Sequence, residues 1–155
     1  MRGMDPLNEV TGARIIVTRR LAWHETDASG HNHFAAALRW VEEAEHQLYR
    51  CIGETDHIPV IPRVHVEVDY SARLYFNDLL TVSVGVIKVG GSSCTFAFGV
   101  DREDGIRAVS GRIVIVHASS TSEGSAPWPS ILREALASPR DFIQSNGGWD
   151  IRERA

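Results

Sequence analysis

The sequence has few cysteines and lacks a long apolar run, and both features restrict the class of protein. Only two cysteines occur among 155 residues, Cys51 and Cys94, and they lie far apart in apolar settings. This usage favours two reduced thiols over a disulfide framework. Apolar runs stay well short of the ~20 residues that span a bilayer, and the start of the chain has no apolar signal core. We therefore expect a cytoplasmic protein that does not interact with membranes.

A strong charge of one sign is also missing. The formal net charge is −4, and the 16 lysines and arginines are scattered along the chain. This distribution argues against a nucleic-acid-binding surface. Hydrophobic residues make up 43% of the sequence and charged residues 23%, which is ordinary for a globular protein. A chain of this length can bury a core large enough to fold as one domain.

The hydrophobic pattern predicts one strand, then one long helix, then four strands. Apolar residues recur at three- and four-residue steps over 34–53, which is typical of a helix that packs on a core. Gly53 is a suitable helix stop. The expected strands are 13–23, 63–72, 78–89, 93–100 and 106–119. One long helix against an antiparallel sheet is an α+β fold.

Composition divides the chain into three parts. Residues 1–12 are expected to be a flexible N-terminal lead, and residues 13–119 the folded domain. Residues 120–155 are expected to be a linker and C-terminal extension, in which a short helix could start near Pro129.

Strict alternation in the segment 63–72 predicts a half-buried strand. One side of this strand should carry Val64, Val66 and Val68, and the other side Arg63, His65, Glu67 and Asp69. The sheet face away from the helix carries both polar and apolar residues, which suits a second subunit better than water. We therefore expect a homodimer or a homotetramer.

Ionisable groups gather where the first strand gives way to the helix, in the stretch WHETDASGHNHF at 23–34. It holds two acids, three histidines and one glycine. A helix that starts near Asn32 or His33 leaves its first amide groups without partners, and Asn32 is a suitable N-cap. These amides and the helix dipole favour negative charge. The backbone N–H of Phe34 could therefore hold a carbonyl oxygen that becomes an oxyanion.

Asp27 lies in the loop before this helix, where a carboxylate can act as a nucleophile or as a general base for water. Gly30 permits the tight turn that brings the carboxylate and the amide to one ligand. Together these groups would suit acyl transfer. Aspartate, serine, glycine and asparagine are also common turn and capping residues, so spacing alone leaves a purely structural interpretation open.

The histidines allow a second functional interpretation. His24, His31 and His33, with Glu25 or Asp27, offer nitrogen and oxygen ligands for zinc or iron. Barrel proteins that use such a histidine pair place it on a strand, whereas here a helix follows at once. We therefore favour polar turn histidines and expect no metal site.

The stretch from Trp23 to Phe34 and the LRWVEEA run that ends at Ala44 resemble the hot-dog-fold acyl-CoA thioesterases, in particular the 4-hydroxybenzoyl-CoA thioesterase family. The resemblance extends over about residues 14–118 and includes the Phe76-Asn77-Asp78 turn. It implies a long central helix wrapped by a five-stranded antiparallel sheet. It also implies an active site that lies between subunits.

Carried over by position, Asp27 matches the catalytic aspartate of that family, and Phe34 matches the helix-start residue whose backbone N–H polarises the thioester carbonyl. One branch of the family has histidine at the position of Phe34, so the resemblance leaves the roles of His31 and His33 open. We expect both histidines, with Asn32, to shape the substrate site. The implied reaction is hydrolysis of an acyl-CoA or acyl-carrier-protein thioester, without a cofactor.

Two rival functions apply to a hot-dog protein with this sequence. Hydration or dehydration of an acyl thioester usually goes with a His-Phe-Pro-Gly or an Asp-x-Asn-x-x-His stretch, and neither is present. A non-catalytic acyl-thioester-binding protein would keep the fold and the ligand but would not turn the ligand over.

Three groups of polar residues outside the junction are further candidates. Glu42, Glu43 and Glu45 could supply a second catalytic carboxylate, and His65 and Glu67 could form a polar strand face that reaches a site across a subunit contact. Lys88, Ser92 and Ser93 could form a phosphate-binding turn. For each group a solvated surface or an ordinary turn is the more common explanation. Cys94 lies in an apolar strand and is predicted to be a packed thiol rather than a nucleophile.

Overall fold

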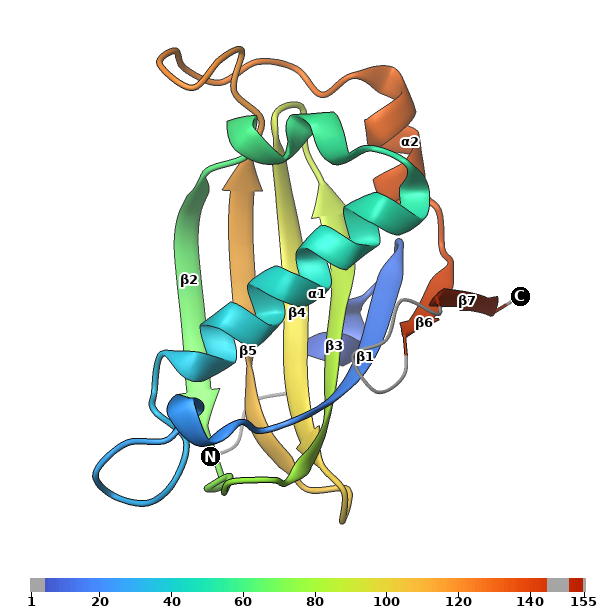
Figure 1. The fold of residues 1–155 in the computed structure, drawn as a ribbon. Helices are drawn as coiled ribbons and strands as arrows, with labels where there is room; N and C mark the ends of the chain where they lie inside the picture. The colour runs from blue at the N-terminus through green and yellow to red at the C-terminus, as the bar shows by residue number, and fades with distance from the viewer. Residues whose placement is uncertain (1–4, 145–150, 155) are drawn as a thin grey trace.

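The protein is built on one seven-stranded sheet with a long helix laid across one face (Figure 1). The computed structural model describes residues 5–144 and 151–154. The strands lie in the order β2-β5-β4-β3-β1-β6-β7. Their bounds are β1 Arg14–Arg20, β2 Arg63–Tyr70, β3 Leu79–Val89, β4 Ser93–Arg102, β5 Arg107–Val116, β6 Asp141–Gln144 and β7 Ile151–Arg154. The helical elements are α1 Ala36–Ile52, α2 Ser130–Ala137 and the 3-10 helices η1 Pro6–Glu9, η2 Trp23–Glu25 and η3 Thr55–Val60.

Helix α1 and the sheet share one hydrophobic core. The helix buries Trp40, Val41, Ala44 and Leu48 against the strands. Alternate residues of β3 and β4 form the sheet side of the core, because successive side chains of a strand point to opposite faces. They are Val82, Val84, Val86, Phe96, Phe98 and Val100. Gly53 ends α1 with a φ of 77°, in the left-handed region, which confirms the predicted helix stop.

The sheet is larger than predicted, and it is mixed. The five predicted strands all form, and neighbouring strands among them pair antiparallel. β6 adds to the free side of β1 in parallel register, from Arg14↔Asp141 to Val17↔Gln144, and β7 pairs antiparallel with β6. The prediction of a five-stranded, purely antiparallel sheet is therefore wrong. Strands of four residues that follow a linker are too short to show an alternating pattern.

Segments near both ends of the described chain pack on the sheet. The short helix predicted near Pro129 is α2, which buries Leu132 and Leu136. Part of the segment predicted to be a flexible lead instead forms η1, which packs on β3 and β4. Glu9 holds it there by an ion pair with Arg112 at 2.9 Å. Residues 1–4 lie outside the described residues.

A β-bulge at the start of β2 changes the side of the sheet that its first residue faces. β2 pairs Arg63 with Ile115 of β5, and the register then shifts before His65, so Val64 is the extra residue. Because Ile115 faces the core, Arg63 lies on the α1 side, where its guanidinium pairs with Glu45 at 2.6 Å. The prediction that Arg63 shares a face with His65 is therefore wrong.

The predictions about thiols and membranes can also be compared with the structure. Cys51 and Cys94 are both free thiols, as predicted. Cys94 is fully buried in the core, which confirms the predicted packed side chain, and this burial raises the pKa of its thiol. Among the described residues no helix is long and apolar enough to cross a membrane.

Candidate active site

The predicted site lies in a tight loop between η2 and α1 (Figure 1). Thr26 and Asn32 form an isolated antiparallel bridge that closes this loop. Within it the Asp27 N–H donates to the His31 carbonyl at 3.1 Å, and the Gly30 N–H donates to the Asp27 carbonyl at 3.0 Å. Gly30 has a φ of 86°, which a residue with a side chain rarely adopts. The tight turn predicted at Gly30 is therefore present.

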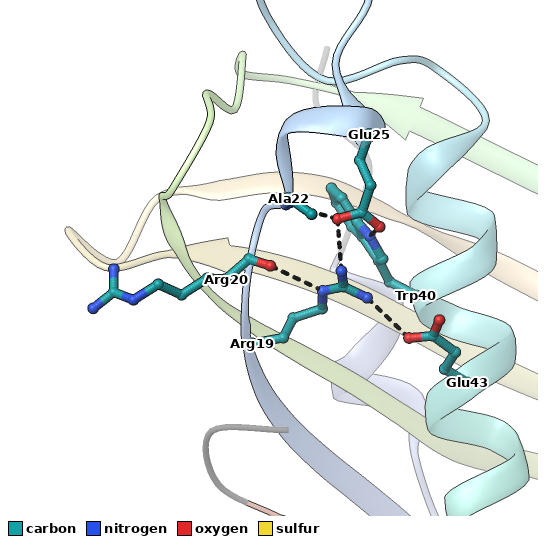
Figure 2. Close-up of polar contacts among 6 residues, drawn as sticks. All are labelled: Arg19, Arg20, Ala22, Glu25, Trp40 and Glu43. Carbon is teal, nitrogen blue, oxygen red and sulfur yellow. Dashed lines mark hydrogen bonds and ion pairs between the residues drawn. The ribbon is translucent and has the colours of Figure 1, made fainter. Parts of the chain in front are cut away.

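Glu25 anchors the start of the loop to both β1 and α1, as Figure 2 shows. Its carboxylate accepts hydrogen bonds from Ala22 N at 2.8 Å, Arg19 Nη2 at 2.6 Å and Trp40 Nε1 at 2.5 Å. Only 10% of the Glu25 side chain is exposed. Arg19 also forms an ion pair with Glu43 at 2.9 Å. Sequence reasoning considered Glu25 only as a metal ligand, and its spacing gave no signal of this anchoring role.

Asn32 is a buried anchor rather than a helix cap. Helix α1 begins at Ala36, with Ala35 at the cap position and no side-chain cap. The Asn32 side-chain oxygen accepts from Leu74 N at 3.1 Å, and Asn32 N donates to the Leu74 carbonyl at 2.8 Å. The predictions of a helix start near Asn32 or His33 and of an Asn32 N-cap are therefore wrong. These bonds keep Asn32 extended, so a turn precedes the helix.

The Phe34 N–H lies in this turn and is a free backbone donor. Among the described residues no hydrogen-bond acceptor is present for it, whereas the polar groups around it are paired. His33 N donates to the Glu25 carbonyl at 2.8 Å, and Ala36 N donates to the His33 carbonyl at 2.9 Å. Ala35 N donates to His33 Nδ1 at 3.0 Å. One unpaired N–H therefore stands two residues before α1 begins.

A cavity of about 360 Å³ joins this loop to the end of β2. Its lining includes Asp27, His31, Phe34, Tyr70 and Arg73. The Tyr70 hydroxyl donates a hydrogen bond to the Phe34 carbonyl. Burial raises the pKa of Tyr70, which keeps the hydroxyl protonated and able to donate. Sequence reasoning missed Tyr70 and Arg73, because an aromatic residue that ends a valine-rich strand looks like ordinary strand composition.

Asp27 lines the cavity as an exposed carboxylate. Its Oδ1 accepts from the Ser29 hydroxyl and, at 2.9 Å, from Ser29 N. These two bonds hold the pKa of Asp27 below its ordinary value, with smaller contributions from His31 and His33. Its Oδ2 has no hydrogen-bond partner among the described residues. The carboxylate is therefore ionised at neutral pH, and one of its oxygens is open to a ligand.

The two loop histidines occupy different places. His31 lines the cavity, and its ring lies edge-on to Tyr75 with centroids 6.4 Å apart. His33 stacks on Phe34 with ring centroids 4.6 Å apart and supports the turn through its bond to Ala35 N. Of the six predicted site residues, the cavity lining includes Asp27, His31, Asn32 and Phe34, and it does not include Gly30 and His33.

The helix glutamates do not reach this cavity. Glu42 and Glu43 are exposed, as expected for a solvated helix face, but Glu45 is buried. Burial raises the pKa of Glu45, although the nearby Arg63 charge and a hydrogen bond from the Tyr49 hydroxyl at 2.5 Å both favour the ionised form. Glu45 therefore joins the helix to β2 and takes no part in the candidate site.

The remaining candidates lie away from the cavity. His65 Nε2 and Glu67 Oε1 are 2.9 Å apart on exposed side chains. The hairpin between β3 and β4, which carries Ser92, lies at the opposite end of the sheet from the η2–α1 loop (Figure 1). Within the described part of the chain, no three histidine, cysteine, aspartate or glutamate side chains are placed to hold one metal ion.

One long helix across a largely antiparallel sheet is the arrangement of a hot-dog fold. The chain belongs to the Thioesterase-like superfamily, whose sequence profile matches residues 21–136. This match includes the site loop, α1 and the strands β2 to β5. No curated protein sequence matches the chain well enough to count as a relative.

Solved structures share this fold at low sequence identity. A 1,4-dihydroxy-2-naphthoyl-CoA thioesterase from Synechocystis has a TM-score of 0.73 at 18% identity, over 79% of this chain and 95% of that chain. A thioesterase from Thermus thermophilus complexed with coenzyme A and zinc has a TM-score of 0.71 at 24% identity, over 78% and 90%. A predicted thioesterase from Bacillus stearothermophilus has a TM-score of 0.72 at 22% identity, over 79% and 93%. These similarities show a shared fold.

Proposed function

We propose that the protein hydrolyses an acyl-CoA or acyl-carrier-protein thioester to a free acid and a thiol. The carrying observation is one cavity that is lined by both Asp27, whose carboxylate is ionised, and Phe34, whose backbone N–H is free among the described residues. Membership of the Thioesterase-like superfamily supports thioester hydrolysis in general. The structural neighbours described with CoA substrates or coenzyme A support CoA as the carrier. A relationship to the 4-hydroxybenzoyl-CoA thioesterase family, suggested by the loop motif, is part of this proposal.

In the proposed reaction, the thioester carbon lies beside Asp27 and the carbonyl oxygen faces the Phe34 N–H. Asp27 either attacks the carbon, forming a mixed anhydride that water then hydrolyses, or removes a proton from the attacking water. In both routes the carbonyl oxygen gains negative charge, and a single backbone donor at that point contributes about 10²–10³ in rate. When the oxyanion collapses the C–S bond breaks, which gives the mixed anhydride in the first route and the free acid in the second. The thiolate leaves and takes up a proton from the water that is consumed.

The other predicted loop residues have supporting roles in this proposal. Gly30 allows the turn that presents Asp27, and His31 forms part of the cavity wall. Asn32 and His33 hold the loop by hydrogen bonds to Leu74 and to the turn before α1. Neither a metal ion nor a redox cofactor is needed for this route.

We also propose that the active form is a homodimer, or a homotetramer assembled from such dimers. β2 is an edge strand of the sheet, and Val64 and Val66 on it are 59% and 40% exposed. An exposed edge strand with apolar side chains is suited to pairing with the same strand of a second copy. Because Tyr70 ends β2 and lines the cavity, a partner at this edge would help to enclose the substrate.

A second candidate function is non-catalytic binding of acyl thioesters. One observation favours it: the two bonds from Ser29 lower the pKa of Asp27 and therefore make its carboxylate a weaker base and nucleophile. Such a protein would bind an acyl-CoA in the same cavity without releasing thiol. The two functions therefore differ in turnover and share the ligand.

A thiol-release assay over a panel of acyl-CoAs tests the proposal, with Asp27→Ala and Asp27→Asn measured beside the unaltered protein. We expect both substitutions to lower kcat by about 10²–10⁴-fold, because each removes the nucleophile or base. Asp56→Asn, at an exposed position in η3, is the matched control and should keep full activity. Full turnover by both Asp27 variants would exclude Asp27 as the catalyst. Binding without turnover in the unaltered protein would favour the second function.

A further inference from the structure

We propose that Tyr70 is a positioning residue that holds the Phe34 backbone donor in the orientation needed for an oxyanion. This inference rests on the function proposed above and adds a residue outside the motif loop to its machinery. The side chain comes from β2, 36 residues along the chain from Phe34, and its hydroxyl donates to the Phe34 carbonyl.

Among the described residues, the hydrogen bonds around the turn include one contribution from outside the η2–α1 junction, and it comes from Tyr70. His33 N is bonded to the Glu25 carbonyl, and Ala35 N is bonded to His33 Nδ1. Both are local bonds within the η2–α1 junction. Among the described residues, the Tyr70 hydroxyl is the one group from outside this junction that is hydrogen-bonded to residues 33–35.

A backbone N–H lies in the peptide plane that it shares with the carbonyl of the preceding residue, and the plane that follows restricts how that first plane can rotate. The plane that contains the Phe34 N–H is held through the His33 carbonyl, which accepts from Ala36 N at 2.9 Å. The plane after Phe34 is held through its carbonyl, which accepts from Tyr70. The unpaired Phe34 N–H belongs to the first of these two fixed planes, and Phe34 and Asp27 both line the cavity. A donor fixed before the substrate arrives needs no reorganisation during the reaction.

The exposure of Tyr70 separates this role from a general contribution to stability. The side chain is 47% exposed, so the ring is not part of the packed core. A single hydrogen bond at a surface position adds little to the free energy of unfolding. Its loss should therefore be seen in the reaction rate and in the local backbone, and the melting temperature should stay nearly unchanged.

The test compares Tyr70→Phe with a matched control, Tyr75→Phe. Tyr75 is 48% exposed on the neighbouring segment, and its hydroxyl has no hydrogen-bond partner among the described residues. We expect Tyr70→Phe to lower kcat about tenfold, with KM within about twofold, because the donor is only partly misplaced. Tyr75→Phe should keep both constants. Amide hydrogen exchange at Ala35 and Ala36, whose N–H groups are bonded to His33, should become faster in Tyr70→Phe only.

Each outcome decides the inference. A selective fall in kcat with faster exchange at Ala35 and Ala36 supports it, whereas an unchanged kcat overturns it. A raised KM with unchanged kcat also overturns it, since Tyr70 would then contact the substrate instead of positioning the donor. If the unaltered protein releases no thiol from any acyl-CoA, the proposed function fails. The exchange measurement then decides whether Tyr70 holds the turn: unchanged rates at Ala35 and Ala36 would reject this role.

Discussion

At the residue scale, the candidate catalyst is adjusted by a neighbour two positions away. Ser29 gives Asp27 two hydrogen bonds, one from its hydroxyl and one from its backbone N–H, and both favour the ionised carboxylate. The pKa of Asp27 therefore lies below its ordinary value. Since the proposed chemistry needs the carboxylate, activity should persist to lower pH than for an unassisted aspartate, and it should fall as pH drops through the lowered pKa.

The substitution Ser29→Ala tests this effect. Loss of the hydroxyl raises the pKa of Asp27 toward the ordinary aspartate value of about 3.9. The acid limb of the kcat/KM profile should therefore move to higher pH, measured between about pH 3 and pH 6 with a fold check by circular dichroism. Ser92→Ala, at the far end of the sheet, is the control. If the acid limbs of the unaltered protein, Ser29→Ala and Ser92→Ala coincide, Ser29 does not lower the pKa of Asp27.

Sequence reasoning identified Asp27, Gly30 and the Phe34 amide because loop carboxylates, turn glycines and junction amides have local signatures. It missed Tyr70 because contact between β2 and the loop depends on how the sheet places its edge strand, which no local pattern records. It also assigned a cap to Asn32, whose actual partner is Leu74. The roles of Tyr70 and Asn32 depend on hydrogen bonds to residues 36 and 42 positions away in the chain.

At the element scale, one carboxylate joins three elements. Glu25 ends η2, receives a bond from Arg19 of β1 and another from Trp40 of α1, and its carbonyl holds His33. The loop that carries Asp27 is therefore fixed at its base to the strand before it and the helix after it. Rigid elements hold functional groups in place more accurately than a free loop does.

Glu25→Gln should lower the free energy of unfolding by about 2 kcal/mol, because the neutral amide cannot accept from all three donors that the carboxylate satisfies. The matched control is Glu43→Gln, which removes the other ion pair of Arg19 at a side chain that is 68% exposed. It should cost under about 0.5 kcal/mol. Urea denaturation measures both. Equal losses would show that Glu25 contributes no more than a surface partner.

The helix itself was predicted well, because its apolar stripe repeats over many turns and Gly53 marks its end. The start was placed too early, since a polar residue before an apolar stripe indicates a cap only when no tertiary partner competes for it. The β2 bulge shows the same limit. One extra residue at Val64 moved Arg63 to the helix side, and a strict period of two has no means of indicating such an insertion.

At the scale of the whole molecule, the exposed valines of β2 distinguish its edge from the rest of the sheet. We expect Val66→Glu to weaken self-association at least about tenfold, since it places charge at the centre of the proposed subunit contact. Analytical ultracentrifugation measures the assembly, and the thiol-release assay measures the linked loss of activity. Ile131→Glu, on an exposed apolar residue of α2, is the control. A fully active monomer in the unaltered protein would contradict the contact.

The sequence pattern was sufficient to predict the long helix and the long strands of the architecture. Strands of seven or more residues and a 17-residue helix leave strong periodic patterns, and the α+β class follows from their order. The mixed character of the sheet was not predictable, because it depends on the four residues of β6 and on a parallel pairing that joins the two ends of the sequence.

That pairing of β6 with β1 determines how far the chain can be shortened for expression. Hydrophobic periodicity indicates a domain limit at residue 119. A fragment that stops there would lack β6, and the backbone N–H and C=O groups on one side of Arg14–Val17 would lose their strand partner. Such a fragment would be prone to precipitate. Shortened versions should therefore retain the chain through at least Gln144.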